Sequence, residues 1–163
     1  MANQDAAFGF KPSRSLVGGS IRNNVYKIAA NYGTSIFSGQ TVEAVAAGGI
    51  EAAAAGDTQQ LGVFGGVQYT DPTSGKPTFK PFYSASTNAS DLEAIVYDDP
   101  QLIFEVQHDG TGTAAMNFSA FDFTGVAGST ISGQSTQELD TSTSGTGGGF
   151  KQLSIVTDPS NDD

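Results

Sequence analysis

The side chains that could act on a substrate are few in this sequence. A nucleophilic triad needs a base beside its serine, and the one histidine of the chain, His108, ends an alternating segment just before a turn. Two carboxylates suffice for glycoside hydrolysis, but Asp98 and Asp99 are adjacent, so an extended backbone points them to opposite sides. Glu105 could approach one of them across a hairpin, yet the chain has no tryptophan, the residue that usually lines carbohydrate clefts. The sequence therefore predicts a protein that is not an enzyme.

Carboxylates near turns are the other chemistry that the sequence offers. Calcium binds hard oxygen ligands, and four aspartates near predicted turns could supply them: Asp98, Asp99, Asp109 and Asp122. No EF-hand or repeat spacing organises these residues, and the simpler interpretation is that Asp98 and Asp99 cap a turn before Pro100. The chain has no cysteine, which excludes disulfides and thiolate metal sites. We predict no cofactor and no metal site, with calcium near these turns as the open alternative.

Composition favours strands over helices. The chain of 163 residues contains 21 Gly, 17 Ser and 16 Thr, and only 15% of its residues are charged, so it lacks the charged faces that long surface helices need. Short alternating segments between turn residues are expected to be strands; they are residues 25–32, 36–39, 61–69, 78–83, 92–97, 102–108, 114–118, 121–126 and 150–156. Residues 41–57 could form a helical turn or an alanine-rich strand. The predicted fold is all-β, a compact β-barrel or β-sandwich of the β-tulip or jelly-roll kind.

Glycine and proline residues predict further details of two of these strands. The three glycines within residues 62–66 lie inside one predicted strand, where glycine often marks a bulge or the close approach of another backbone. Pro77 and Pro81 border the next segment and restrict it to the edge of a sheet or to an exposed loop.

Residues 1–24 are predicted to be an extended arm, residues 25–157 a single β domain and residues 158–163 a solvated tail. Residues 1–27 hold four cations against one acid, a net charge of +3, whereas residues 28–163 hold three cations against sixteen acids, a net charge of −13. The acidic body excludes nucleic acid as a partner. We expect neither a signal peptide nor a membrane span, because no apolar run is long enough. The candidate contact residues of the arm are Phe8, Phe10, Lys11, Pro12, Arg14 and Arg22.

The arm alternates bulky and flexible residues around Phe8 and Phe10. Two phenylalanines on a basic, extended segment suggest anchors for an acidic protein surface, and we expect them to dock into a neighbouring subunit. The alternative is that they fold back onto the core of their own chain. The two interpretations differ in whether these side chains are buried within a single chain.

One string of residues, DDPQLIFEVQHDG at positions 98–110, resembles a segment of the capsid decoration (cement or head-stabilising) proteins of tailed bacteriophages. The residues of this family-like motif are Asp98, Asp99, Pro100, Phe104, Glu105, Gln107 and Asp109. Further strings are similar to that family in the same order along most of the chain; they are AFGFKP at 7–12, the glycine pair at 18–19, YGTSIFS at 32–38, LGVF at 61–64 and GQSTQELD at 133–140.

The resemblance implies a β-rich structural protein on the outer capsid surface of a virion, made in the host cytoplasm. It also implies that the partner is the major capsid protein, which the chain would clamp as a homo-oligomer, with a trimer favoured over a dimer. Two alternatives remain from the sequence. The first is a glycan-binding β-sandwich adhesion module, and the second is another head–tail or tail protein of a phage, such as a tail-tube protein in six-fold rings.

Overall fold

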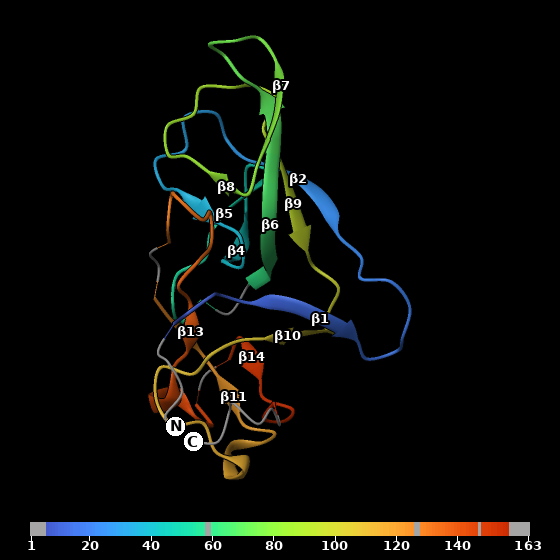
Figure 1. Cartoon of the computed structure of the whole chain (residues 1–163), viewed down its shortest axis with the longest axis vertical. Helices are drawn as coiled ribbons and strands as arrows, with labels where there is room; N and C mark the ends of the chain where they lie inside the picture. The colour runs from blue at the N-terminus through green and yellow to red at the C-terminus, as the bar shows by residue number, and fades with distance from the viewer. Residues whose placement is uncertain (1–5, 58–59, 126–127, 147, 157–163) are drawn as a thin grey trace.

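The fold is all-β, as composition predicts. Figure 1 shows an elongated molecule with a large sheet towards one end and most of the short strand pairs towards the other. This computed structural model describes residues 6–57, 60–125, 128–146 and 148–156.

The large sheet is antiparallel and has the strand order β2-β9-β6-β4-β5, with β7 paired to the remaining part of β6. Its strands are β2 (Asn24–Lys27), β4 (Thr41–Val45), β5 (Gly49–Ala52), β6 (Gln60–Thr70), β7 (Pro77–Lys80) and β9 (Glu93–Tyr97). A bulge between Phe64 and Gly66 falls in the predicted glycine-rich stretch. Ile28 forms one parallel bridge with Ile50 of β5. The sheet therefore curls, but its described strands form no closed barrel.

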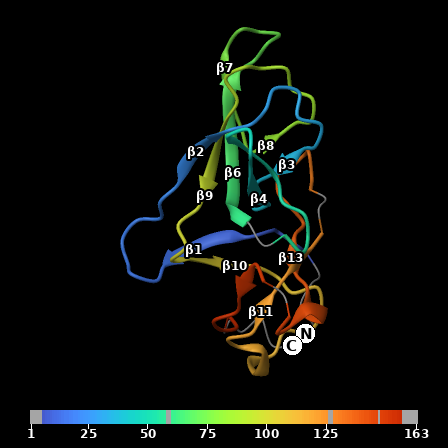
Figure 2. The same cartoon turned by 180° about the vertical axis from the view of Figure 1, so that it is seen from behind.

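Short antiparallel pairs complete the fold. They are β3 (Ile36–Phe37) with β8 (Phe82–Tyr83), β1 (Lys11–Ser15) with β10 (Leu102–Glu105), β11 (Ala120–Phe121) with β14 (Phe150–Lys151), and β12 (Phe123–Thr124) with β13 (Glu138–Leu139). Ile36 and Tyr83 pack into the same cluster as Val67 of the large sheet, which makes this part of the molecule sandwich-like. Figure 2 shows β1 and β10 crossing below the large sheet.

Two apolar clusters fill the fold, and β6 contributes to both. The upper cluster contains Ile28, Ile36, Val42, Ile50, Phe64, Val67, Tyr69, Tyr83, Ala89, Leu92, Ala94 and Val96. The lower cluster contains Phe10, Ala53, Val63, Phe121, Phe123 and Leu139. Val63 and Phe64 are consecutive, so their side chains point to opposite faces of the strand. One long strand thereby joins the two halves of the core.

Several expected strands are shorter or different in the structure. Residues 114–118 form no strand; Ala114–Met116 is a single-turn 3-10 helix, η1, in keeping with the helix propensity of its Ala-Ala-Met sequence. The strand expected at 102–108 ends at Glu105, because the chain then turns to pair with β13 through a His108–Leu139 bridge. A second 3-10 turn, η2 (Thr141–Thr143), follows β13. Residues 41–57 adopt the alanine-rich strand alternative, as the β4–β5 hairpin. The predicted tail, residues 158–163, lies outside the described residues.

Candidate protein-binding surfaces

The amino-terminal segment, predicted to be an extended arm, pairs with its own chain. β1 lies antiparallel to β10 in a register that runs from Lys11↔Glu105 to Ser15↔Leu102. Lys11 Nζ lies 3.8 Å from Glu105 Oε2, and Ser13 Oγ donates a hydrogen bond to Glu105 Oε1 at 3.2 Å. The structure thus brings together two segments that the sequence singled out separately, the arm and the DDPQLIFEVQHDG string. The boundary predicted at residue 24 therefore separates no independent arm from the body.

Phe10 is a core residue of its own chain. Its side chain is 1% exposed, stacks on Phe150 at 4.2 Å between ring centroids and meets Phe104 edge-on at 6.3 Å. Its backbone N–H donates to Gly39 O at 2.8 Å. The prediction that Phe10 anchors in a neighbouring subunit is wrong, because the lower cluster of the same chain already encloses it. Phe8 is 36% exposed and remains at the surface.

The two adjacent family-like aspartates make different contacts in the folded chain. Asp99 Oδ1 accepts from the Gln101 N–H at 2.9 Å, which confirms the turn-capping role predicted before Pro100. The same prediction is wrong for Asp98, which accepts from two side chains of β2, Asn24 Nδ2 at 2.9 Å and the Tyr26 hydroxyl. The hydrogen bond to Asp98, together with burial, raises the pKa of Tyr26 above its usual value.

The remaining family-like residues also make local contacts. Asp109 Oδ1 accepts from the Thr141 N–H at 2.9 Å and from Thr141 Oγ1 at 2.7 Å, and Gln107 Oε1 accepts from the Ala6 N–H at 3.3 Å. Across residues 6–57, 60–125, 128–146 and 148–156, no three His, Asp or Glu side chains lie close enough to share a metal ion.

His108 is half-buried against the lower cluster. Its ring meets Phe121 edge-on at 5.3 Å between centroids, and its Nδ1 is buried without a hydrogen-bond partner. Burial lowers the pKa of His108 below 6.5, although a hydrogen bond to Gln152 and the charge of Asp109 act in the opposite direction. This environment favours the neutral imidazole.

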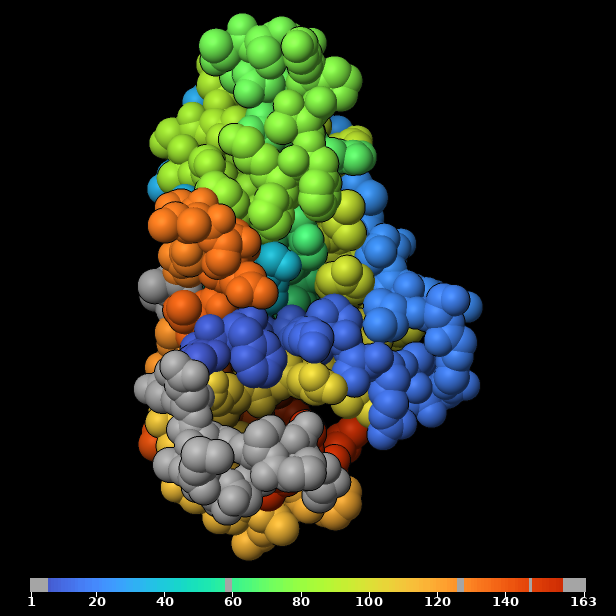
Figure 3. All heavy atoms as spheres, viewed as in Figure 1, coloured from blue at the N-terminus to red at the C-terminus, as the bar shows by residue number. Residues whose placement is uncertain are grey.

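The connection between β1 and β2, residues 16–23, is an exposed segment with three apolar residues, and we term it the projecting loop. Every residue in it is exposed, including Leu16 at 57%, Val17 at 71% and Ile21. Figures 1 and 3 show it leaving the side of the molecule as a separate lobe.

The length of the projecting loop explains why it leaves the surface. β1 pairs with β10 and β2 pairs with β9, so the projecting loop and the β9–β10 turn connect the same two sheets. The turn needs four residues, 98–101, whereas the loop has eight. The additional residues have no room between the sheets and extend into solvent.

The cations beside the projecting loop are exposed. Arg14 of β1 and Arg22 of the loop form no ion pair with any residue in the described part of the chain. The loop therefore presents apolar side chains next to unpaired positive charge, on a chain whose net charge is −10.

A second exposed apolar surface, the lower patch, consists of Phe118, Lys151 and Leu153. Phe118 is 69% exposed and adopts the left-handed backbone conformation with φ at 68°. Lys151 Nζ lies 5.9 Å from the centre of its ring. The sequence predicts strands at residues 114–118 and 150–156 and does not indicate this patch. Phe118 in the left-handed region, uncommon for a bulky residue, is visible only in the structure.

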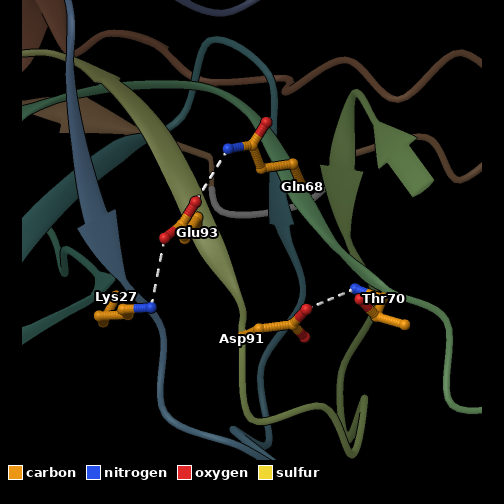
Figure 4. A network of polar contacts seen from close by, with 5 residues as sticks. All are labelled: Lys27, Gln68, Thr70, Asp91 and Glu93. Atoms are coloured by element: carbon orange, nitrogen blue, oxygen red, sulfur yellow. Dashed lines mark hydrogen bonds and ion pairs between the residues drawn. The ribbon is translucent and has the colours of Figure 1, made fainter. Parts of the chain in front are cut away.

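A shallow groove of about 470 Å³ crosses the outer side of the large sheet. It is lined by Gln68, Tyr69, Thr70, Pro77, Thr78, Phe79, Asp91 and Glu93. Phe79 is 59% exposed along its wall. Two carboxylates stand in the groove, each held in place by neighbours on adjacent strands (Figure 4).

The groove carboxylates are ordered by hydrogen bonds. Asp91 Oδ2 accepts from the Thr70 N–H at 3.0 Å, and Glu93 accepts from Gln68 Nε2 at 2.9 Å and from Lys27 Nζ at 3.3 Å. Bonding to Thr70 lowers the pKa of Asp91, and bonding to Gln68 and Lys27 lowers the pKa of Glu93. Both groups are therefore negatively charged at neutral pH.

Comparisons with known proteins identify no relative. The chain matches no protein-family model, and neither a curated protein nor a solved structure matches it. Within the described residues, no helix has the length and apolar character needed to cross a bilayer. The function is therefore inferred from the surfaces themselves.

Proposed function

We propose that the protein is a structural protein of a bacteriophage head, a decoration or cement protein that binds the outer capsid surface and bridges major capsid proteins as a homo-oligomer. The observation that supports this proposal is the presence of two separate exposed apolar surfaces, the projecting loop and the lower patch, on an acidic body. Linking two neighbouring proteins requires one contact surface for each of them, whether the neighbour is a capsid protein or a second copy of this chain.

The remaining surface suits such a role. A strongly acidic chain stays soluble when many copies are crowded together. Contacts repeated by symmetry add their effects, so that each surface needs only modest affinity. Neither exposed surface contains a group arranged for catalysis, and the side chains that decide binding would be Leu16, Val17 and Ile21 on one side and Phe118 on the other.

Shortening the projecting loop tests the proposal without disturbing the core. Deleting residues 18–21 leaves four residues between β1 and β2, the number that the neighbouring turn uses. Halving a loop changes its closure free energy by only about 0.6 kcal/mol, so the variant should fold. Its occupancy on heads of the phage that encodes this chain, stripped of the protein and then re-exposed to it, should fall severely.

A matched control distinguishes loss of a specific capsid contact from the general effect of removing an exposed apolar side chain. Ile131 is 98% exposed on a distant loop, and Ile131→Ser should bind heads like the unaltered protein. Phe118→Ser should reduce occupancy through the lower patch. Unchanged occupancy of both the loop deletion and Phe118→Ser, or recovery of the protein on tails rather than heads, would contradict the proposal.

A further inference from the structure

We infer that the projecting loop of one copy docks into the groove between β6, β7 and β9 of a second copy. The inference rests on one part of the proposed function, namely that the projecting loop binds another protein. It identifies that protein as a second copy of this chain. The lower patch then remains free to bind the outer capsid surface.

Charge makes the groove the favourable place for this loop. Two copies that each carry −10 repel one another, so a self-contact must bring opposite charges together. Arg22 has no ion-pair partner among the described residues, and neither has Asp91. Docking would place the exposed guanidinium of Arg22 beside the ionised carboxylate of Asp91. Arginine suits this contact because its planar fork matches a carboxylate.

The apolar parts of the two surfaces also match. The groove wall offers Phe79 and Pro77, and the loop offers Val17 and Ile21. Phe79 and Val17 are 59% and 71% exposed, and Ile21 is 38% exposed. Protein interfaces combine apolar anchors with a charged rim. A groove of about 470 Å³ can accept more than one side chain of such a loop.

The two surfaces lie at different levels of one molecule, so the contact must join separate copies. In Figure 1 the loop projects at the level of β1, whereas the groove lies towards the end that carries β7. A contact between unlike surfaces is heterologous, and it closes into a ring when the rotation between copies allows it.

Charge exchange in solution tests the contact without any capsid. Sedimentation equilibrium of the full chain should show self-association that weakens with added salt. Arg22→Glu and Asp91→Arg should each weaken it roughly tenfold or more, the effect of about 1.4 kcal/mol. The double variant Arg22→Glu/Asp91→Arg restores opposite charges across the contact and should recover most of the association.

Controls distinguish the contact from a change of net charge. Lys151→Glu alters the net charge as Arg22→Glu does, but it lies in the lower patch and should leave self-association unchanged. Phe79→Ser should weaken it. A protein that is monomeric up to about 1 mM, or an oligomer that all the groove and loop variants leave intact, would overturn the inference. Binding of the protein to phage heads is measured in a separate experiment. It shows whether the proposed function is correct even if the contact between copies is not.

Discussion

Phe10→Ala should destabilise the folded chain strongly, although residue 10 lies in a segment whose sequence predicts an extended arm. The Phe10 side chain is 1% exposed and packs in the lower cluster between Phe104 and Phe150. Removing it leaves a cavity bounded by aromatic rings from β10 and β14. It also removes the contact by which the amino-terminal segment is fixed to the core.

The expected cost follows from the type of site. Truncation of a buried phenylalanine to alanine costs about 3–5 kcal/mol, and each aromatic pair adds about 0.5–1.5 kcal/mol beyond burial. Because Phe10 makes two such pairs, we expect a loss of about 4 kcal/mol or more. Domains of ordinary stability unfold with about 5–15 kcal/mol, so this single change removes a large part of the total.

Urea unfolding followed by circular dichroism measures the effect, and Phe8→Ala is the matched control. Phe8 lies two residues earlier and is 36% exposed, so its truncation should cost less than about 1 kcal/mol. If Phe10→Ala cost no more than Phe8→Ala in the free chain, the amino-terminal segment would not pack on its own core. The anchor would then have to bind a neighbouring subunit, as the sequence first suggested.

Two further outcomes can be measured on the isolated protein. His108 is the only histidine, so NMR titration of its ring should give a midpoint below 6.5, because burial lowers its pKa. The stability that comes from the neutral His108 is present above pH 6.5 and is lost as the pH falls through the folded-state pKa. A midpoint at or above 6.5 would contradict the burial described. Gly62→Ala should cost about 1–3 kcal/mol, because an added Cβ would lie 2.4 Å from Tyr97 O. Gly33→Ala is the control, since nothing lies within 4 Å of its added Cβ, and equal unfolding midpoints for the two variants would refute the close approach of β6 and β9.

Local signals in the sequence were sufficient for the features that depend on neighbouring residues. The glycines in residues 62–66 predicted the bulge in β6. Pro77 predicted an edge strand, and β7 pairs with β6 alone among the described strands. Asp99 predicted a turn cap before Pro100, and its Oδ1 accepts from the N–H group of Gln101 at 2.9 Å. Each of these features is decided within a few residues of chain.

Features that depend on distant residues could not be predicted. The pairing of Lys11 with Glu105 joins residues 94 positions apart, and a period of two in each strand does not specify its partner. The groove combines three separate stretches, with Gln68, Phe79 and Asp91 as one residue from each. The strands predicted at residues 121–126 and 150–156 are reduced to the two-residue strands β11, β12 and β14. Packing of the lower cluster determines them.

The structure also divides the positive charge of the amino-terminal region between two roles. Lys11 pairs with Glu105 across β1 and β10, and Lys27 pairs with Glu93 across β2 and β9, so both lysines have partners within the chain. Arg14 and Arg22 lie between them in the sequence and form no ion pair in the described part of the chain. Even an exposed ion pair within the chain would contribute little to its stability. Stability of the fold therefore gives no reason for arginine at these two positions. Unpaired guanidinium groups beside exposed Leu16, Val17 and Ile21 are instead suited to a carboxylate-bearing apolar surface on another molecule.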